Sequence, residues 1–373
     1  MKPITVLNVV GARPNLVKMA PIVDAMRLRP GEIRYRLVHT GQHYDAQLNG
    51  VLFKDLDLPP ADIELGIGSG SHAEQIGRIM IRFERECLNH KPDLVLVVGD
   101  VNSTLACAFA AKKIGIPVAH VEAGLRSRDL GMPEEINRLC TDAIADYLFT
   151  TDTIANENLR LEGIADSRIH FVGNVMIDTL VKYRPAARKL TLTEQLGLIG
   201  RKYGLVTLHR PSNVDSAIAL KEVLEALTAV ARHLPLIFPL HPRTETMVRE
   251  FGFEHYFKRN APVEGVWATE PMGYLEFLHL MLGACLVLTD SGGIQEETTV
   301  LGIPCLTLRE NSERPITCTV GTNRLVGRQK EAIERAAEAV LNEPPAAARI
   351  PEKWDGRAAE RLVDILAQTQ SVG

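Results

Sequence analysis

One arrangement of segments occurs in both halves of this chain. In each half, an apolar run ends at an aspartate, a helix-forming segment follows, and Gly-Ile-Pro introduces another apolar run. The first copy covers residues 94–122 and the second covers residues 286–309. Short buried strands that alternate with helices are typical of a parallel sheet with helices on both faces. The arrangement therefore predicts two similar doubly wound α/β units, not a solenoid.

The length of the chain supports this division. A chain of 373 residues is too long for one hydrophobic core and fits two domains. We expect the first domain to comprise residues 1–172 and the second to comprise residues 173–353. A final helix within residues 354–373 follows a proline-rich segment at 344–351, and we expect it to return to the first domain.

Composition and charge argue against several classes of partner. The chain is 46% apolar and has a formal net charge of −4, so there is no reason to expect nucleic acid or an anionic membrane surface as partner. The six cysteines are scattered, without a C-x-x-C pair, as in proteins of a reducing compartment. The apolar run within residues 1–10 is too short for a signal peptide or a membrane span. We therefore expect a cytoplasmic protein.

The stretch Thr-Asp-Ser-Gly-Gly-Ile-Gln-Glu-Glu at residues 289–297 is the first candidate site. It joins an apolar run at 284–288 to a helix-forming segment, so backbone N–H groups and the positive end of a helix dipole meet at its Ser-Gly-Gly turn. Such a turn is an anion-binding site. Glu297, one turn into the helix, would face a neutral part of the same ligand, such as a ribose diol. A tight turn that needs glycine for its backbone angles explains the pattern equally well.

Charged and polar residues follow most of the expected strands. Ligands of open parallel sheets bind outside the carboxyl ends of the strands, and two facing units would bring both edges into one cleft. Any one of these residues has an ordinary explanation, because strand-end polar residues often cap the following helix. The whole set is harder to explain by folding, and it comprises Arg13, Gln42, His43, Asp100, Glu122, His209, Arg210, His241, Asp290 and Ser291.

Several well-known cofactor motifs are missing from the sequence. No G-x-G-x-x-G follows the first apolar run, and no G-x-x-x-x-G-K-[ST] is present, which argues against dinucleotide and P-loop sites. No H-E-x-x-H or Cys/His cluster suggests a zinc site. The residues alone therefore give no reason to expect a metal or a nicotinamide cofactor.

Taken together, the motifs of the chain resemble those of the non-hydrolysing UDP-N-acetylglucosamine 2-epimerases over essentially the whole length. The resemblance implies two Rossmann-like domains in the GT-B arrangement, a UDP-sugar substrate and a homodimer. It rests on Gly-Ala-Arg-Pro at 11–14, Thr-Gly-Gln-His at 40–43, Gly-Asp at 99–100, Asn-Ser-Thr at 102–104, His-Val-Glu-Ala-Gly-Leu-Arg at 120–126, Pro-Glu-Glu-Ile-Asn-Arg at 133–138, His-Arg at 209–210, residues 289–297 and Glu-Arg-Pro at 313–315.

The resemblance also implies a reaction. UDP leaves C1 of the sugar while a base removes the C2 proton, and UDP adds back to the 2-acetamidoglucal after a proton arrives from the other face. This route requires carboxylates on both faces of the ring. Asp100, Glu122 and Glu134 match the acid/base positions of the family, without indicating which removes and which returns the proton. His209 matches the histidine that meets the departing diphosphate, where an imidazolium would stabilise the developing charge.

Further positions match residues that bind the substrate in the family. Arg13 and Lys18 match residues that contact the phosphates or another part of the substrate in the family. The resemblance assigns the first domain the acid/base chemistry and the second the nucleotide. In the second domain it assigns Ser291, Gly292 and Gly293 to the phosphates, Glu297 to the ribose, Arg314 to the nucleotide or sugar, Tyr274 and Phe277 to the uracil, and Met272 to the base through its backbone.

The chain departs from the family pattern at a few positions. Asn15 replaces the usual glutamate, Pro-Ser at 211–212 replaces a pair that ends in glutamate, and Ile316 replaces an acidic residue. Many bacterial members bind a second substrate molecule as activator. Gln42 fits that pattern, but Asp45 and the loop at 68–71 do not, so we expect weak or absent substrate activation.

Alternative functions remain open at this point. One is 2-epimerisation of a modified UDP-sugar, such as a 2,3-diacetamido uronic acid, because related sequences carry the segments at 241–243 and 273–276. Others are a hydrolysing 2-epimerase that releases free sugar, a GT-B glycosyltransferase, and an idle UDP-sugar sensor. His209 followed by Arg210 favours the non-hydrolysing reaction, and three carboxylates favour epimerisation over glycosyl transfer.

Overall fold

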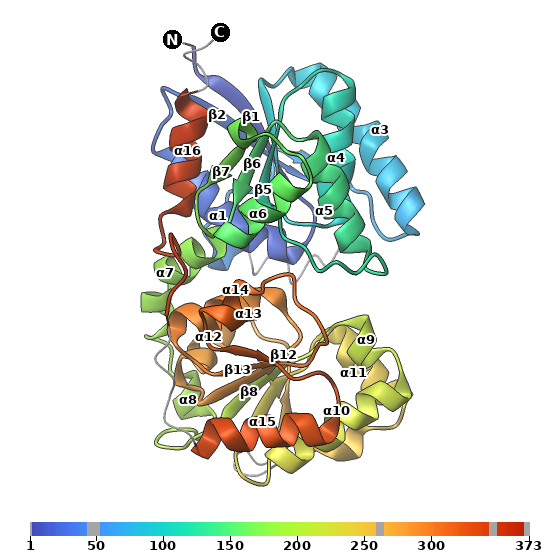
Figure 1. The fold of residues 1–373 in the computed structure, drawn as a ribbon, viewed down its shortest axis with the longest axis vertical. Helices are drawn as coiled ribbons and strands as arrows, with labels where there is room; N and C mark the ends of the chain where they lie inside the picture. The colour runs from blue at the N-terminus through green and yellow to red at the C-terminus, as the bar shows by residue number, and fades with distance from the viewer. Residues whose placement is uncertain (1, 43–52, 259–264, 343–348, 369–373) are drawn as a thin grey trace. The chain divides into compact units, whose positions relative to one another are not determined.

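The computed structural model describes residues 2–42, 53–258, 265–342 and 349–368. The chain forms two compact units, of which unit 1 comprises Met1–Lys182 and Glu352–Gly373 and unit 2 comprises Tyr183–Pro351. The chain crosses from unit 1 to unit 2 within helix α7 (Val175–Ala187). Figure 1 shows both units as sheets covered by helices.

Unit 1 is built on a parallel sheet. Its strand order among the described residues is β3-β2-β1-β4-β5-β6-β7, and the partners run parallel throughout. The strands are β1 (Ile4–Val10), β2 (Ile33–His39), β3 (Ile63–Glu64), β4 (Leu94–Val98), β5 (Val118–Ala123), β6 (Tyr147–Thr150) and β7 (Ile169–Phe171).

Helices cover this sheet because their apolar faces match it. In α3, the buried side chains Ile79, Phe83 and Cys87 recur at helical spacing, which is typical of a helix with one face against a core. Ser71 and Glu74 begin this helix with reciprocal hydrogen bonds, as a capping box does. The helical segments of unit 1 are α1 (Arg13–Arg27), α3 (His72–His90), α4 (Asn102–Lys113), α5 (Pro133–Ile144), α6 (Thr153–Leu161), the 3-10 turn η1 (Asp166–Arg168), the first part of α7, and α16 (Ala358–Gln368).

Unit 2 repeats the plan. Its sheet has the order β10-β11-β9-β8-β12-β13-β14, again parallel. The strands are β8 (Gly204–Thr207), β9 (Leu236–Pro239), β10 (Phe257–Lys258), β11 (Val266–Thr269), β12 (Leu286–Thr289), β13 (Cys305–Thr307) and β14 (Asn323–Leu325). The helical segments are α8 (Leu192–Gln195), α9 (Pro211–Val214), α10 (Ala217–Val230), α11 (Pro242–Glu250), η2 (Glu254–Tyr256), α12 (Tyr274–Gly283), α13 (Gly292–Leu301), α14 (Ile316–Thr319) and α15 (Lys330–Asn342).

Each unit has its own hydrophobic core. In unit 1, one core cluster joins apolar residues of the central strands to α3 and α4. In unit 2, a cluster joins the central strands to α10 and α15. Separate cores of this kind are what the length of the chain requires. The prediction of two doubly wound α/β units is confirmed.

The order of the strands reverses direction at the centre of each sheet. In unit 1 this point lies between β1 and β4, and in unit 2 it lies between β8 and β12. At such a point the connections that follow neighbouring strands leave toward opposite faces, which opens a crevice for ligands. Candidate residues follow each of these four strands: Arg13, Asp100, His209 and Ser291.

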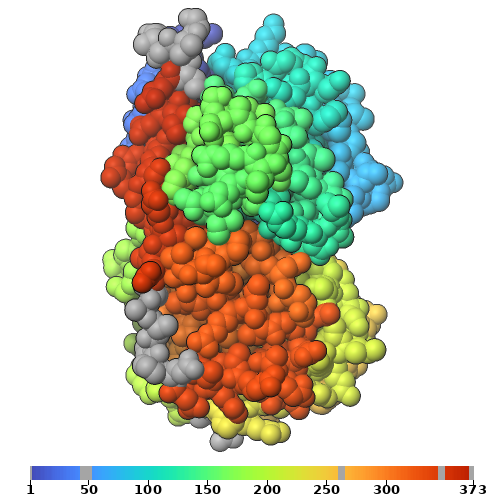
Figure 2. Space-filling view, in the orientation of Figure 1, coloured from blue at the N-terminus to red at the C-terminus, as the bar shows by residue number. Residues whose placement is uncertain are grey.

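The C-terminal segment belongs to unit 1. Helix α16 packs against α1, and Figure 2 shows the red C-terminal atoms against blue and green atoms of this unit. Trp354 is buried and donates from Nε1 to the carbonyl of Thr151 at 2.9 Å. Asp178 of α7 accepts hydrogen bonds from the backbone N–H groups of Ala358 at 3.0 Å and Ala359 at 2.7 Å. A side chain distant in sequence therefore caps the N-terminus of α16.

Removing this cap should loosen α16. We expect Asp178→Ala to lower the free energy of unfolding of unit 1 by about 1–3 kcal/mol, because it leaves two helix N–H groups without their acceptor. Urea unfolding followed by Trp354 fluorescence measures this change in a Trp267→Phe background, since Trp267 lies in β11 of unit 2.

Asp364→Ala is the matched control for the same helix. Asp364 pairs with Arg29, and its side chain is 41% exposed, so its loss should change the free energy of unfolding by less than about 1 kcal/mol. Equal effects of the two alanine variants would contradict the role given to Asp178.

Within the described residues, no helix combines the length and the apolar character that crossing a membrane requires.

Candidate active site

The turn after β1 is held by Asn15. Its Oδ1 accepts hydrogen bonds from the N–H groups of Gly11 and Ala12, both at 3.1 Å, and its Nδ2 donates to the carbonyl of Val98 at 3.0 Å. A glutamate in this position could not donate to Val98, because a carboxylate has no hydrogen to offer. The asparagine therefore joins the first turn to the end of β4. Arg13, half-buried, follows this turn at the start of α1.

Asp100 follows β4 and is positioned by α5. Gly99, just before it, has a φ of +71°, a conformation that favours glycine. The Asp100 carboxylate forms an ion pair with the buried guanidinium of Arg138, and the Asp100 carbonyl accepts from Asn137 Nδ2 at 2.8 Å. Both the side chain and the backbone of Asp100 are thus fixed by one helix.

Glu122 lies at a bulge near the end of β5. The pairing with β6 shifts register between Val121 and Ala123, and Glu122 has a φ of +69°. Left-handed backbone is unfavourable for a residue other than glycine and is often found at functional sites. The bulge directs the Glu122 carboxylate to Lys18 of α1, and the two buried side chains form an ion pair. A bulge that redirects one side chain in this way is typical of an active site.

Glu134 lies in the first turn of α5 and is half-buried. The next residue, Glu135, is buried and accepts from the N–H groups of Ser127 at 3.0 Å and Arg128 at 2.9 Å. Its ion pair with Arg138 has a distance of 2.6 Å. Burial alone would raise the pKa of Glu135, but these N–H donors and Arg138 lower it. Glu135 thus anchors the helix that carries Glu134.

Gln42 belongs to a network at the start of α4. Its Oε1 accepts from the N–H of Ser103 at 2.9 Å and from the Ser103 hydroxyl at 2.7 Å, and the same hydroxyl lies 2.8 Å from Thr40 Oγ1. The side chain of Gln42 therefore has a structural role within unit 1. His43 and Asp45, also considered from the sequence, lie outside the described residues.

In unit 2, the motif at residues 289–297 forms the turn from β12 into α13. Ser291 precedes the helix, and its side chain makes no capping hydrogen bond to it. Its N–H instead donates to Thr289 Oγ1 at 2.9 Å. The helix starts at Gly292 and Gly293, so its first N–H groups are not covered by the side chains of these residues. An anion is suited to this position.

Arg314 packs against the first turn of α13. Its Nε pairs with Glu296 at 2.7 Å and its Nη1 pairs with Glu313 at 2.6 Å. A Cβ atom at Gly292 would lie 2.7 Å from Arg314 Cζ and 3.0 Å from Glu313 Oε1. Glycine is required at this position because the guanidinium group occupies the space of a side chain.

Glu297 is buried in α13 and accepts a hydrogen bond of 2.7 Å from the Tyr274 hydroxyl. Burial raises the pKa of Glu297 to about 7; the Tyr274 hydroxyl lowers it and the neighbouring Glu296 raises it further. Tyr183 packs edge-on against Tyr274 at 6.4 Å between ring centroids. Met272 and Phe277, on the segment that carries Tyr274, are half-buried. The structure thus brings together Glu297 and Tyr274, two of the residues selected from the sequence.

The raised pKa of Glu297 predicts a dependence of stability on pH. Between about pH 4.5 and 7 the folded chain holds a proton on Glu297 that the unfolded chain loses, so this group reduces the free energy of unfolding as pH rises. Glu297→Gln removes this titratable group, and with it the loss of stability as pH rises, and keeps an acceptor for Tyr274. We expect the variant to be more stable than wild type at pH 8, by roughly 3 kcal/mol at most, and similar to it at pH 5. Urea unfolding followed by Trp267 fluorescence in a Trp354→Phe background measures the difference, and a pH-independent difference would contradict the assignment.

His209 follows β8 and lies beside Asp290. The buried Asp290 carboxylate accepts from the backbone N–H groups of His209 at 3.1 Å and Arg210 at 2.9 Å, and from Asn213 Nδ2 at 3.0 Å. His209 Nδ1 lies 3.2 Å from Asp290 Oδ1. Burial lowers the pKa of His209, and the Asp290 carboxylate only partly opposes this. An adjacent diphosphate would favour protonation of the ring.

No group of three or more histidine, cysteine, aspartate or glutamate residues that could hold a metal ion occurs among the described residues.

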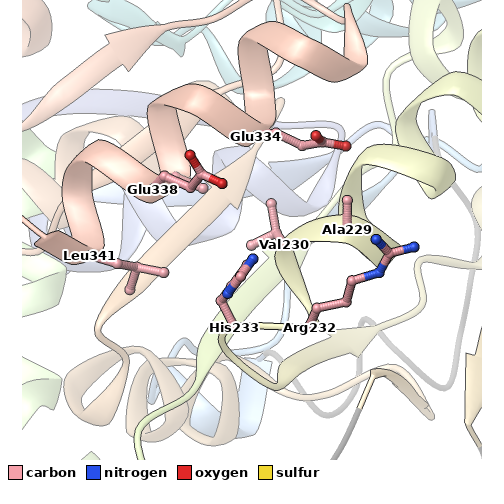
Figure 3. Close-up of a pocket in the computed structure, with 8 residues that line it drawn as sticks. Ala229, Val230, Arg232, His233, Glu334, Glu338 and Leu341 are labelled. Atoms are coloured by element: carbon pink, nitrogen blue, oxygen red, sulfur yellow. The ribbon is translucent and has the colours of Figure 1, made fainter.

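A pocket of about 170 Å³ lies between α10 and α15 (Figure 3). It lies at the end of α10 that leads into β9, and therefore near the amino ends of the strands, whereas the candidate residues lie at their carboxyl ends. It is lined by Ala229, Val230, Arg232, His233, Glu334, Ala337, Glu338 and Leu341.

The structure adds Arg138, which occurs in the sequence analysis only within a longer motif and which holds Asp100 in place. Asp290, one of the strand-end candidates, accepts from the backbone N–H of His209 and so fixes that residue. Lys18 was selected as a substrate contact, and the structure pairs it with Glu122. Pairings between such distant positions have no local signal in the sequence.

Comparison with known proteins identifies relatives over nearly the whole chain. A family model described as UDP-N-acetylglucosamine 2-epimerase matches residues 26–367. The UDP-N-acetylglucosamine 2-epimerase of Methanocaldococcus jannaschii is 42% identical over 368 residues, which cover 96% of this chain and 97% of that protein. The UDP-2,3-diacetamido-2,3-dideoxy-D-glucuronate 2-epimerase of Pseudomonas aeruginosa is 39% identical over 371 residues, which cover 97% of this chain and 99% of that protein.

Solved structures show the same similarity. The crystal structure of the Methanocaldococcus jannaschii enzyme in complex with UDP-GlcNAc and UDP has a TM-score of 0.89, with coverage of 98% of this chain and 99% of that chain. The crystal structure of the enzyme from Neisseria meningitidis bound to UDP-GlcNAc has a TM-score of 0.87 at 30% identity, with coverage of 98% and 100%.

Proposed function

The chain belongs to the UDP-N-acetylglucosamine 2-epimerase family, and on that premise we propose that it interconverts UDP-N-acetylglucosamine and UDP-N-acetylmannosamine by reversible epimerisation at C2. The family match confirms the resemblance that was inferred from the motifs. The observation that carries the proposal is the placement of Asp100 just after β4 and of Glu122 near the end of the adjacent strand β5, each paired with a cation.

Unit 1 supports the acid/base part of the reaction. Asp100, Glu122 and Glu134 are its proposed catalytic residues. Arg138 keeps Asp100 in one orientation, and Lys18 does the same for Glu122. Residues fixed by buried partners reach a reactive geometry with little reorganisation. We propose that Lys18 and Arg13 also contact the phosphate side of the substrate.

Unit 2 supports the nucleotide part. We propose that Ser291, Gly292 and Gly293 bind the phosphates at the N-terminus of α13, where the helix dipole and unused N–H groups favour anions. Arg314, which pairs with Glu296 and Glu313 beside this turn, is proposed to contact the nucleotide or the sugar. The other proposed contacts are Glu297 with the ribose, Tyr274 and Phe277 with the uracil, and Met272 with the base through its backbone.

The proposed reaction has two halves. In the first, a carboxylate removes the C2 proton, the C1–O bond breaks with its electron pair leaving on UDP, and a C1–C2 double bond forms in the 2-acetamidoglucal. Protonated His209 would stabilise the charge that develops on the departing diphosphate. In the second half, a carboxylic acid returns a proton to the other face of C2 and the UDP oxygen forms the C1–O bond again.

The Pseudomonas aeruginosa relative supports a second candidate substrate. That protein is named for a diacetamido uronic acid, and its identity of 39% is close to the 42% of the Methanocaldococcus jannaschii enzyme. The same chemistry at C2 serves both sugars, so the alternative changes the groups at C3 and C6 and leaves the acid/base residues in place. Comparing kcat/KM for the two UDP-sugars distinguishes them.

Incubation in D2O tests the proposed reaction. The purified enzyme and UDP-N-acetylglucosamine should yield the C2 epimer, and both recovered UDP-sugars should carry deuterium at C2 by NMR. Release of free N-acetylmannosamine would indicate a hydrolysing enzyme. An epimer without deuterium, or no change in the presence of enzyme, would overturn the proposal.

Two further expectations concern the oligomeric state and the cellular location of the enzyme. We propose a homodimer that works in the cytoplasm, because the family resemblance implies the dimer and the sequence has the composition of a reducing compartment. Light scattering coupled to gel filtration measures the mass in solution, and a monomer at working concentration would contradict the dimer.

A further inference from the structure

His120 is a buried histidine in the middle of unit 1. It lies in β5 and has no exposed surface. Its Nδ1 lies 2.6 Å from Asp142 Oδ1, and its Nε2 lies 2.8 Å from the carbonyl oxygen of Gly99. Both ring nitrogens therefore face oxygen atoms at hydrogen-bond distance.

The partners of His120 determine its protonation. A backbone carbonyl only accepts hydrogen bonds, so Nε2 must donate to Gly99. Asp142 is also acting as an acceptor, because it receives the N–H of Gly124 at 3.0 Å and pairs with Arg126 at 2.7 Å. The ion pair with Arg126 and the N–H of Gly124 favour the ionised form of Asp142 independently of His120. With an ionised Asp142, Nδ1 must donate as well, and a ring that donates from both nitrogens is an imidazolium.

The contacts of this pair reach every segment that carries a proposed catalytic carboxylate. Gly99 immediately precedes Asp100. Gly124 lies two residues beyond Glu122, and Asp142 lies on α5, the helix that begins beside Glu134. One buried ion pair thus links the ends of two strands to a helix.

We propose that His120 is a positioning residue, which as a buried imidazolium paired with Asp142 holds the segments of Asp100, Glu122 and Glu134 at their catalytic spacing. The proposal rests on the function proposed above. It assigns His120 no contact with the substrate, since the ring is enclosed by protein on all sides. Displacements of about 1 Å in such segments lower rates by about 100-fold.

Nitrogen NMR of the wild-type protein tests the charge without using any substrate. In protein labelled with 15N at histidine, both ring nitrogens of His120 should have the shifts of protonated nitrogens at pH 7, and His120→Gln assigns the signal. His170 of β7 is the internal reference, because burial lowers its pKa and its ring should be neutral. An unprotonated nitrogen on His120 would overturn the proposal.

Kinetics of His120→Gln and Asp142→Asn test the positioning role. Each change should lower kcat by about 100-fold, while KM and the Kd for UDP, measured by calorimetry, change by less than about threefold. His170→Gln is the matched control and should leave kcat unchanged, since His170 lies on the edge strand β7 and packs on Tyr147 and Phe149 of β6, away from the segments of Asp100 and Glu134. Unchanged kcat in the first two variants would overturn the proposal.

The two measurements also separate this inference from the proposed function. If wild-type enzyme shows no epimerisation, the proposed function fails, whatever the NMR result. If wild-type enzyme is active and His120 carries a single ring proton, only the positioning inference fails. A variant that does not fold affects the kinetic arm alone, and the NMR result on wild type still decides whether the charge is present.

Discussion

Replacing Asp100 by asparagine or Glu122 by glutamine should lower kcat by about 10²–10⁴-fold and leave UDP binding almost unchanged. Each substitution removes one group that transfers a proton, and general acid/base catalysis contributes a factor of this size. The proposed UDP contacts belong to unit 2, whereas Asp100 and Glu122 belong to unit 1. Glu134→Gln should behave in the same way, because the third carboxylate serves the same chemistry.

The experiment combines kinetics with calorimetry. kcat and KM come from initial rates of UDP-N-acetylglucosamine conversion over a range of concentrations up to saturation, and the Kd for UDP comes from titration of each variant. Asp166→Asn is the matched control, since Asp166 lies in η1 of the same unit with a side chain that is 74% exposed. A loss of UDP affinity as large as the loss of kcat in all three carboxylate variants would contradict this division of roles.

Gly292→Ala should weaken UDP binding by at least about tenfold, or 1.4 kcal/mol. The new methyl group would overlap the guanidinium of Arg314, which is held by Glu296 and Glu313. Relief of this overlap moves Arg314 away from the N-terminus of α13 and disturbs two buried ion pairs, and changes of this kind cost about 1–3 kcal/mol. Calorimetric titration with UDP measures the effect.

Gly77→Ala is the control for introducing a methyl group. Gly77 also lies in a helix, α3, but a Cβ atom there would have no neighbour within 4 Å. The substitution should leave UDP affinity unchanged and stabilise unit 1 by about 0.4–1 kcal/mol, since alanine favours the helix. Equal affinities of wild type and Gly292→Ala would show that Arg314 and the first turn of α13 do not bind UDP.

Much of the fold could be predicted because its signals are local. The apolar residues of α3 recur at helical spacing in the sequence, and the structure forms a helix over His72–His90. The continuous apolar run before Gly99 predicted a buried strand, and every residue of β4 is buried. Hydrophobic periodicity and turn residues involve positions that are close together in the sequence. Individual helices and strands are determined over the same short range.

The partners within the candidate site could not be predicted in the same way. Asp100 and Glu122 were selected because they follow strands, but nothing near them in sequence indicates Arg138 or Lys18. His120 occurs within an apolar strand, where a satisfied core histidine is the ordinary interpretation. The bulge at Glu122 also has no local signal, because it depends on the register with β6.

The two doubly wound units, the turns after their strands and the family to which the chain belongs could be predicted, since all three are contained in short contiguous patterns. Which charges meet follows from the folded arrangement alone. Glu122 pairs with a lysine 104 positions away, Asp100 with an arginine 38 positions away, and His120 with an aspartate 22 positions away. These separations are bridged by the order of strands in the sheet, and that order results from packing of the whole unit and not from any one segment.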